Sequence, residues 1–79
     1  MEMIFIGQSI IVRKISKRGG DIAYGLCRPY GNGTPILEYS SLKEANFIAR
    51  YAEEHGGSLD SLIRHAAKDA WNKEQISLF

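Results

Sequence analysis

The sequence predicts an α+β fold, in which a three-stranded antiparallel sheet (a meander) is followed by two helices packed on one face of the sheet. Residues 3–16 are rich in β-branched and aromatic types, and glycine-containing turns follow them at short intervals. From residue 41 onward, apolar residues recur at the three- and four-residue steps of a helix. No internal repeat or linker divides the 79 residues, so we expect one domain over residues 1–74.

Each predicted strand is bounded by a residue that favours a turn. Gly7 interrupts the first strand, which is therefore either a short strand followed by a longer one or a single strand with a bulge. Gly19 and Gly20 permit the positive φ values that a tight hairpin needs. Pro29 removes a hydrogen-bond donor after the return strand, and a second turn follows it. The expected strands lie within residues 3–16, 22–28 and 34–39.

Both predicted helices carry signals for where they begin and end. Ser41 and Glu44 have the spacing of a capping box, in which each side chain can bond to the other residue's backbone N–H. Gly56 and Gly57 are expected to end the first helix, and Ser58 to cap the second. The apolar stripes are Leu42, Ala45, Ile48, Ala49 and Ala52 in the first helix and Leu59, Leu62, Ile63, Ala66, Ala67, Ala70 and Trp71 in the second.

The composition is that of a globular protein, with 44% hydrophobic and 24% charged residues. Cys27 is the single cysteine, which excludes an intramolecular disulfide and fits a reducing compartment. The N-terminal residues lack the basic start and long apolar stretch of a signal peptide, and no apolar run approaches the length of a membrane span. We therefore expect a cytoplasmic protein that does not engage a membrane.

The sequence contains no pattern typical of a catalytic or metal site. His55 and His65 are ten residues apart in separate predicted elements, and no Cys-x-x-Cys or His-x-x-x-His spacing occurs. Cys27 is expected to be a small buried apolar residue. His55 is expected to contact free carbonyls at the end of the first helix. These observations predict a non-enzymatic protein without a cofactor or a metal ion.

Positive charge is concentrated in the first part of the chain. Residues 1–34 hold five basic and two acidic side chains, a net +3, whereas residues 35–79 hold five basic and seven acidic, a net −2. A basic β-hairpin fits the major groove of double-stranded DNA, where its cations can contact phosphates. The alternative is an ordinary solvated face of a small sheet. The candidate nucleic-acid-binding residues are Arg13, Lys14, Lys17, Arg18 and Arg28.

The order of sheet and helix over about residues 9–55 loosely resembles two kinds of small three-stranded DNA-binding domain. These are the domains of plant AP2 factors and the arm-binding regions of some integrases. The resemblance rests on topology and on the basic positions named above. It implies a DNA-binding module, of phage or mobile-element origin, that uses the hairpin.

The chain's last five residues, Gln75-Ile76-Ser77-Leu78-Phe79, closely resemble the motif by which bacterial proteins bind the DNA sliding clamp, the beta subunit of DNA polymerase III. That motif consists of a glutamine, an aliphatic residue (usually leucine), a serine or aspartate, and then leucine and phenylalanine. Ile76 is a conservative departure from it. The resemblance implies that Leu78 and Phe79 fill an apolar pocket, that Gln75 enters a smaller polar pocket, and that Ile76 bridges the two.

Three hypotheses follow from these patterns. The first is a small regulatory or adaptor protein that binds the sliding clamp through residues 75–79 and modulates DNA replication or repair. The second is the DNA-binding module described above, and the third is an inhibitor or interaction protein with another protein partner, whose tail packs in its own core. Only residues 72–74 separate Trp71 from Gln75, and they span about 10 Å if extended. Under the first hypothesis, the folded domain therefore lies against the clamp when the tail is bound.

Overall fold

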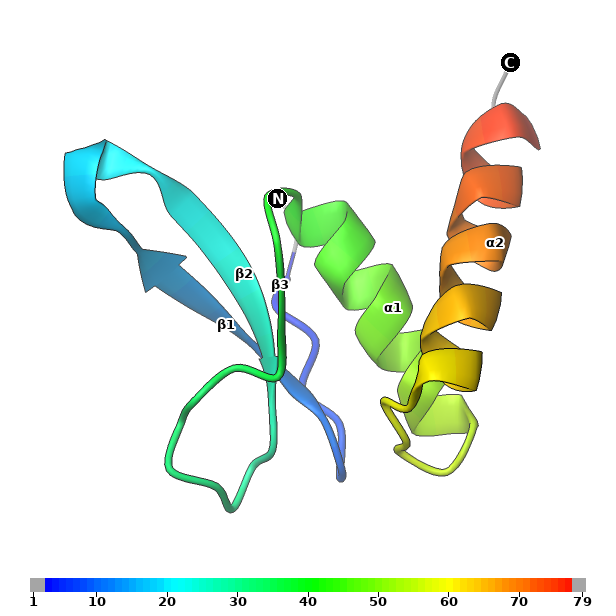
Figure 1. The fold of residues 1–79 in the computed structure, drawn as a ribbon, viewed down its shortest axis with the longest axis horizontal. Helices are drawn as coiled ribbons and strands as arrows, with labels where there is room; N and C mark the ends of the chain where they lie inside the picture. The colour runs from blue at the N-terminus through cyan, green and yellow to red at the C-terminus, as the bar shows by residue number, and fades with distance from the viewer. Residues whose placement is uncertain (1–2, 78–79) are drawn as a thin grey trace.

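The computed structural model describes residues 3–77 of the chain, and it has the α+β arrangement that the sequence predicts. A three-stranded antiparallel sheet precedes two helices (Figure 1). A 3₁₀ turn, η1, connects the first two strands. The elements are β1 (Ile11–Ser16), η1 (Arg18–Gly20), β2 (Ile22–Cys27), β3 (Leu37–Tyr39), α1 (Leu42–Glu54) and α2 (Ser61–Ser77).

The sheet has the order β1-β2-β3, and its register decides which residues face α1. Val12 lies opposite Leu26, which in turn lies opposite Leu37. Neighbouring positions on paired strands share a face, so these three apolar side chains form one row against the helix. The hairpin between β1 and β2 turns at Gly19 and Gly20, whose φ angles of 82° and 85° are the positive values that the sequence predicts.

The third strand is shorter than expected: β3 begins at Leu37, although the predicted strand begins at residue 34. Pro35 lies across the face of the sheet opposite α1, where a Cβ atom on Gly25 would be 2.7 Å from the Cβ of Pro35. The segment before Leu37 therefore lies behind β2 at Pro35 and joins the edge of that strand at Ile36, whose N–H donates to the Leu26 carbonyl at 2.8 Å. At its other end β3 stops at Tyr39, opposite Tyr24, so β2 and the hairpin extend past it.

The N-terminal segment bridges to β1 at a single residue, so the predicted strand region of residues 3–16 contains one strand, β1, preceded by an isolated bridge instead of by a short strand. Ile6 bridges to Ile11, and the Val12 N–H donates to the Phe5 carbonyl at 2.9 Å. The side chain of Asn46 in α1 hydrogen bonds to the backbone of this segment. Its Oδ1 accepts from the Phe5 N–H at 2.9 Å, and its Nδ2 donates to the Met3 carbonyl at 2.7 Å. A helix side chain thus supplies the bonds that a neighbouring strand otherwise gives.

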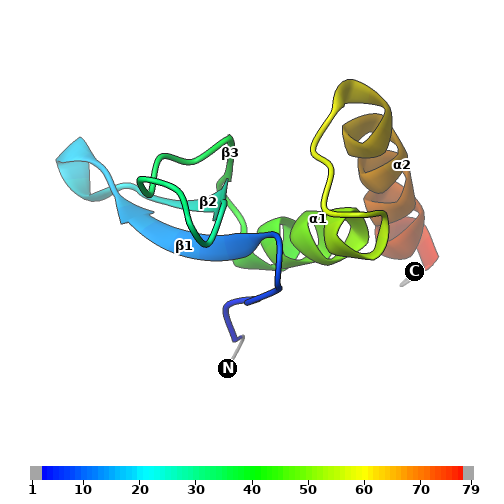
Figure 2. The same ribbon diagram turned by 90° about the horizontal axis from the view of Figure 1, so that it is seen from below.

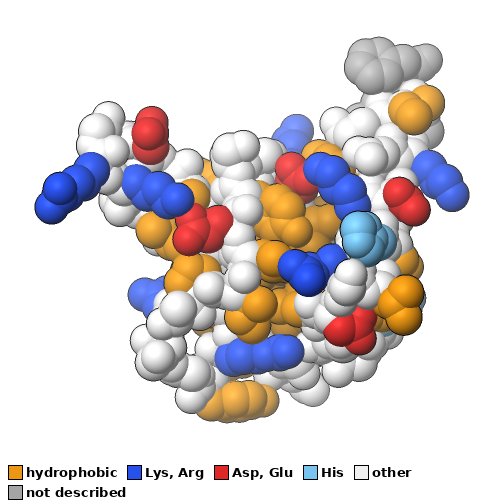
Figure 3. Space-filling model, in the orientation of Figure 1, with side chains coloured by type: hydrophobic (Ala, Val, Ile, Leu, Met, Phe, Trp, Pro, Cys, Tyr) orange, Lys and Arg blue, Asp and Glu red, His pale blue; other side chains and the backbone are white. Residues whose placement is uncertain are grey.

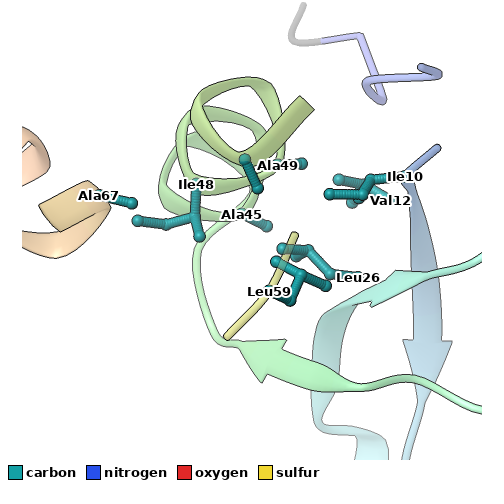
Figure 4. Close-up of a cluster of buried hydrophobic side chains, with 9 residues drawn as sticks. Ile10, Val12, Leu26, Ala45, Ile48, Ala49, Leu59 and Ala67 are labelled. Atoms are coloured by element: carbon teal, nitrogen blue, oxygen red, sulfur yellow. The ribbon is translucent and has the colours of Figure 1, made fainter. Parts of the chain in front are cut away.

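The hydrophobic core lies between α1 and the sheet. Ala45 and Ala49 point from α1 toward Val12 and Leu26, and their short side chains allow the helix to approach the strands closely (Figure 4). Ile48 lies on another part of α1, toward α2, and is fully buried. Burial of an isoleucine or leucine side chain contributes about 1.5–3 kcal/mol, so this row of contacts is a main source of stability.

Ser41 caps α1 and the paired glycines end it, as the sequence predicts, but the Glu44 carboxylate pairs with Lys68, so only the Ser41 half of the predicted capping box is seen. Ser41 is the N-cap residue, and its Oγ accepts from the Glu44 N–H at 3.4 Å. At the other end, the Gly57 N–H donates to the Ala52 carbonyl at 2.8 Å. Gly56 and Gly57 have φ angles of 83° and 76°. They occupy the left-handed region that commonly ends a helix and that glycine adopts without steric cost.

The start of α2 differs from the prediction, because Asp60 caps this helix and Ser58 does not. The Asp60 carboxylate accepts from the Ile63 N–H at 3.0 Å, whereas the Ser58 Oγ accepts from the N–H of Asp60 itself. Leu59 is 8% exposed and packs into the core beside Leu26. Placing Leu59 in the core keeps the chain non-helical for two residues longer than expected, so the helix begins at Ser61.

The second helix packs on α1, on the side away from the strands. Figure 2 shows the sheet, α1 and α2 side by side in that order. Ala67 is fully buried against α1, and the ring of Trp71 lies 5.4 Å from that of Phe47. The small Ala67 side chain allows the two helices to approach closely. The position of α2 relative to the sheet therefore depends on α1.

The turn that precedes β1 is fastened to α1 by Glu53. The Glu53 Oε1 accepts from the N–H groups of Ser9 and Ile10, at 2.8 and 3.1 Å. These bonds, chiefly the one from Ser9, lower the pKa of the Glu53 carboxyl because they stabilise its charged form. A Cβ atom at Gly7 would collide with the same carboxylate, so the sequence needs a glycine there.

The bonds to Glu53 predict a pH-dependent contribution to stability. Because the folded-state pKa is below the ordinary value of 4.5, the contribution is fully present above pH 4.5 and is lost as the pH falls through the folded-state pKa. We expect the difference in free energy of unfolding between the wild type and Glu53→Gln, from urea titrations, to shrink as the pH is lowered below 4.5. A difference that is constant down to pH 2.5 would contradict the assignment.

Candidate functional site

The C-terminal end of α2 projects beyond the rest of the molecule (Figure 1). Trp71 is half-buried against α1, but Asn72, Lys73 and Glu74 are exposed. Further along, the Ile76 side chain is 71% exposed. The Ile76 side chain therefore lies outside the hydrophobic core of the described residues.

The structure describes only part of the predicted clamp-binding peptide. Gln75, Ile76 and Ser77 form the last residues of α2; Gln75 is half-buried and Ile76 is exposed. Leu78 and Phe79 lie outside the described residues. Because residues 72–74 are helical rather than extended, Gln75 lies only about 6 Å from Trp71 along the helix axis.

Helical geometry limits what Gln75 and Ile76 can do together. Consecutive side chains of an α-helix point about 100° apart, so these two cannot enter neighbouring pockets of one groove while the helix persists. The carbonyl groups of a last helical turn have no partners within the helix, and such ends open readily. The peptide can therefore become accessible in full when the last turn of α2 unwinds.

Four of the five predicted nucleic-acid-binding residues lie together on the β1–β2 hairpin. Lys14 shares the α1-facing side of the sheet with Tyr24, and Arg13 lies on the opposite side. Arg18 is exposed in η1. Two of the four cations have partners within the chain: Lys17 Nζ is 2.6 Å from Glu38 Oε1, and Arg13 Nη1 donates to the Gly33 carbonyl at 3.2 Å.

Arg28, the fifth predicted residue, lies just past the end of β2 that is opposite the hairpin turn. Its Nη1 donates to the Ser9 carbonyl at 3.1 Å and to the Gly57 carbonyl at 2.6 Å. The half-buried guanidinium therefore connects the turn before β1 to the loop between the helices. The structure does not bring Arg28 together with the other four residues.

The remaining chemically reactive side chains have the environments that the sequence predicts. Cys27 is 1% exposed, and burial raises the pKa of its thiol, an effect that the charge of Arg13 opposes. His55 stacks on Tyr51 with ring centroids 4.1 Å apart, and its Nδ1 is 2.7 Å from the Tyr51 carbonyl, which accepts the bond. Within residues 3–77, no three His, Cys, Asp or Glu side chains are grouped so that they could hold a metal ion.

Sequence reasoning missed a groove between β3 and α2. Its volume is about 490 Å³. Burial, and then the neighbouring Glu44 carboxylate, raise the pKa of Tyr39 in this groove, and the charge of Arg64 opposes both. No sequence signal could have located it, because its two walls are 24 or more residues apart and meet only through α1. The lining includes Leu37, Tyr39, Glu44, Arg64, His65 and Lys68.

Comparisons with protein-family models, with curated proteins and with solved structures find no match to this chain. Neither helix of the part that the structure describes combines the length and apolar character that a membrane crossing requires.

The contacts of Arg28 predict a role in stability that Arg18 does not share. We expect Arg28→Ala to lower the free energy of unfolding by about 1.5–3 kcal/mol, because it removes charged hydrogen bonds to two carbonyl groups. Arg18→Ala is the matched control, and its effect should stay within about 0.5 kcal/mol. Chemical denaturation of both variants measures the two values. Equal effects would show that the Arg28 contacts contribute nothing of their own.

Proposed function

We propose that the protein binds the bacterial DNA sliding clamp through Gln75–Phe79 and acts as a non-enzymatic regulator or adaptor in DNA replication or repair. The observation that carries this proposal is the position of the motif at the projecting end of α2, where Ile76 is 71% exposed. The exposure of Ile76 also counts against the alternative that this part of the tail packs into the chain's own core.

Binding has two steps in this proposal. The last turn of α2, residues 75–77, unwinds so that the motif residues can enter one groove. Leu78 and Phe79 then bury their side chains, which contributes about 1.5–3 kcal/mol each. Ordering the backbone costs about 1–2 kcal/mol per residue. Because the gain and the cost are similar in size, the interaction is expected to be of weak-to-moderate affinity and readily exchanged.

The short distance between the motif and the domain determines the consequence of binding. Trp71 is fastened to α1 by its contact with Phe47, and Gln75 follows about 6 Å further along the helix. The folded domain must therefore lie against the clamp whenever the tail is bound. In that position it obstructs other proteins that use the same groove, which is the action of a regulator of clamp access.

The clamp titration uses the full chain, a Leu78→Ala/Phe79→Ala double variant and Leu62→Ala as the matched control. Leu62 is 81% exposed near the other end of α2. We expect the double variant to bind at least about 100-fold more weakly, since losing two buried side chains removes about 3 kcal/mol or more. Leu62→Ala should bind like the wild type.

Two outcomes of this titration would contradict the proposal. Equal binding by the wild type and the double variant would show that the tail does not mediate binding. If none of the chains binds, the sliding clamp is not a partner of this protein. The melting temperature provides an independent check. A chain without residues 75–79 should melt within about 2 °C of the full chain, whereas a tail packed into the core would lower the melting temperature by several degrees.

DNA binding by the hairpin is the second candidate function. The observation that favours it is the extension of the hairpin past β3, which carries Lys17 and Arg18 beyond the third strand. Arg13 and Lys14 lie on the part of the hairpin that is beside β3. The order β1, β2, β3 and α1 also agrees with the topology on which the predicted resemblance rests.

Measuring the affinity of the protein for duplex DNA at several salt concentrations tests whether the hairpin binds DNA. If it binds phosphates, glutamine substitutions at Arg13, Lys14, Lys17 and Arg18 should reduce the slope of log affinity against log salt by about 0.9 for each phosphate that is no longer neutralised. Lys43→Gln and Lys73→Gln are controls on the two helices and should leave the slope unchanged. A slope that does not respond to the four hairpin substitutions would exclude this site.

A further inference from the structure

The strand β3 forms an open edge of the sheet. It pairs with β2 on one side, and within residues 3–77 no strand pairs with its other side. The edge is short, because β3 has only three residues, but it lacks two other common means of preventing further pairing. Leu37–Tyr39 contains no proline, and its charged residue, Glu38, is directed to Lys17 at 2.6 Å. An edge of this kind can accept another extended chain as an additional strand.

The groove between β3 and α2 lies beside this edge. Leu37 and Tyr39 supply its apolar floor, and α2 forms the facing wall with Arg64, His65 and Lys68. Figure 3 shows apolar side chains exposed in the middle of the molecule between the sheet and α2, with charged side chains around them. The volume of about 490 Å³ is within the roughly 300–1,000 Å³ typical of binding sites for small ligands.

The charges of the groove favour a negatively charged occupant. Both acidic residues of the lining already have a cation: Glu38 pairs with Lys17, and Glu44 pairs with Lys68. Arg64 lines the groove, and its charge acts on Asp60 and Tyr39 nearby, but within the part of the chain that the structure describes its side chain makes no ion pair or hydrogen bond. An arginine in this state matches a carboxylate well, because its planar group can donate two parallel hydrogen bonds.

We propose that the β3–α2 groove binds an extended acidic peptide segment of a partner protein, which joins the sheet as a fourth strand beside β3. An aspartate or glutamate of the segment binds Arg64. A residue two positions away lies on the same side of the added strand and packs an apolar side chain on Leu37 and Tyr39. This site is separate from the clamp-binding tail and does not depend on the proposed function.

The test is a titration of the full, isotope-labelled chain with blocked heptapeptides in which a Glu or Asp and a Val, Ile, Leu or Phe stand two positions apart, so that both side chains lie on the same side of the strand. We expect members of this set to shift the amide signals of residues 37–40 and 61–68. Matched peptides with Gln or Asn at the acidic positions should bind about tenfold more weakly or worse, since they cannot form the charged hydrogen bond. No response to any acidic peptide, or an equal response to the neutral ones, would overturn the proposal.

Substitutions in α2 test whether Arg64 is the residue that binds the carboxylate of the peptide. Arg64→Gln should weaken peptide binding about tenfold or more, whereas Lys73→Gln, an exposed position further along the same helix, should not change it. Arg64 is exposed, so its substitution should leave the fold intact, and the amide spectrum verifies this. Equal binding by both variants would overturn the proposal.

The same measurements distinguish an acidic peptide from two other possible occupants of the groove, a second copy of the chain and a nucleic acid. Shifts at residues 37–40 that depend on protein concentration without peptide would indicate a second copy of the chain, and displacement of the peptides by duplex DNA would indicate a nucleic acid. Either result would overturn the acidic-peptide proposal. Removing residues 75–79 should leave peptide binding unchanged, and Arg64→Gln should leave clamp binding unchanged. The two proposals therefore succeed or fail separately.

Discussion

The packing of α1 on the sheet is the interaction on which the rest of the structure depends. Ala45 and Ala49 bring this helix close to the strands, and Ile48 links it to α2. Two polar residues of the same helix, Asn46 and Glu53, hold the backbone of the N-terminal segment. Because α2 packs on α1 rather than on the sheet, the position of α2 relative to the strands is set through this one helix.

Local signals were sufficient to predict the elements of this fold. The hairpin glycines, the Ser41 cap and the paired glycines after α1 act over a few residues, and all three appear in the structure as expected. The two departures come from interactions between residues distant in sequence. Burial of Leu59 moved the start of α2 to Ser61, and the packing of Pro35 on Gly25 shortened β3. A sequence pattern does not contain such interactions.

The candidate sites also differ in whether they depend on neighbouring residues in the sequence or on residues that the fold brings together. The tail peptide is a continuous motif, so its residues could be named from the sequence. Arg18 and Arg28 look alike in the sequence because both lie near an end of the predicted return strand, yet one is exposed and the other binds two carbonyl groups inside the molecule. The groove beside β3 was not predictable, since it exists only because α1 holds α2 at a distance from the sheet.

The separation of α2 from the sheet has consequences for both proposed sites. It leaves the groove open along β3, and it allows the end of the helix to project with Ile76 exposed. In this account the domain is a rigid support that presents a short peptide to the clamp. The last turn of the helix is the part that changes conformation, and the sheet and α1 keep their structure.

The most direct test of this account is an amide spectrum of the isotope-labelled chain mixed with the sliding clamp. We expect the signals of residues 75–79 to change or broaden, the helical shifts of residues 75–77 to disappear, and the signals of β1, β2 and β3 to keep their free-state pattern. Changes centred on the sheet with residues 75–79 unaffected, or no change at any residue, would contradict it.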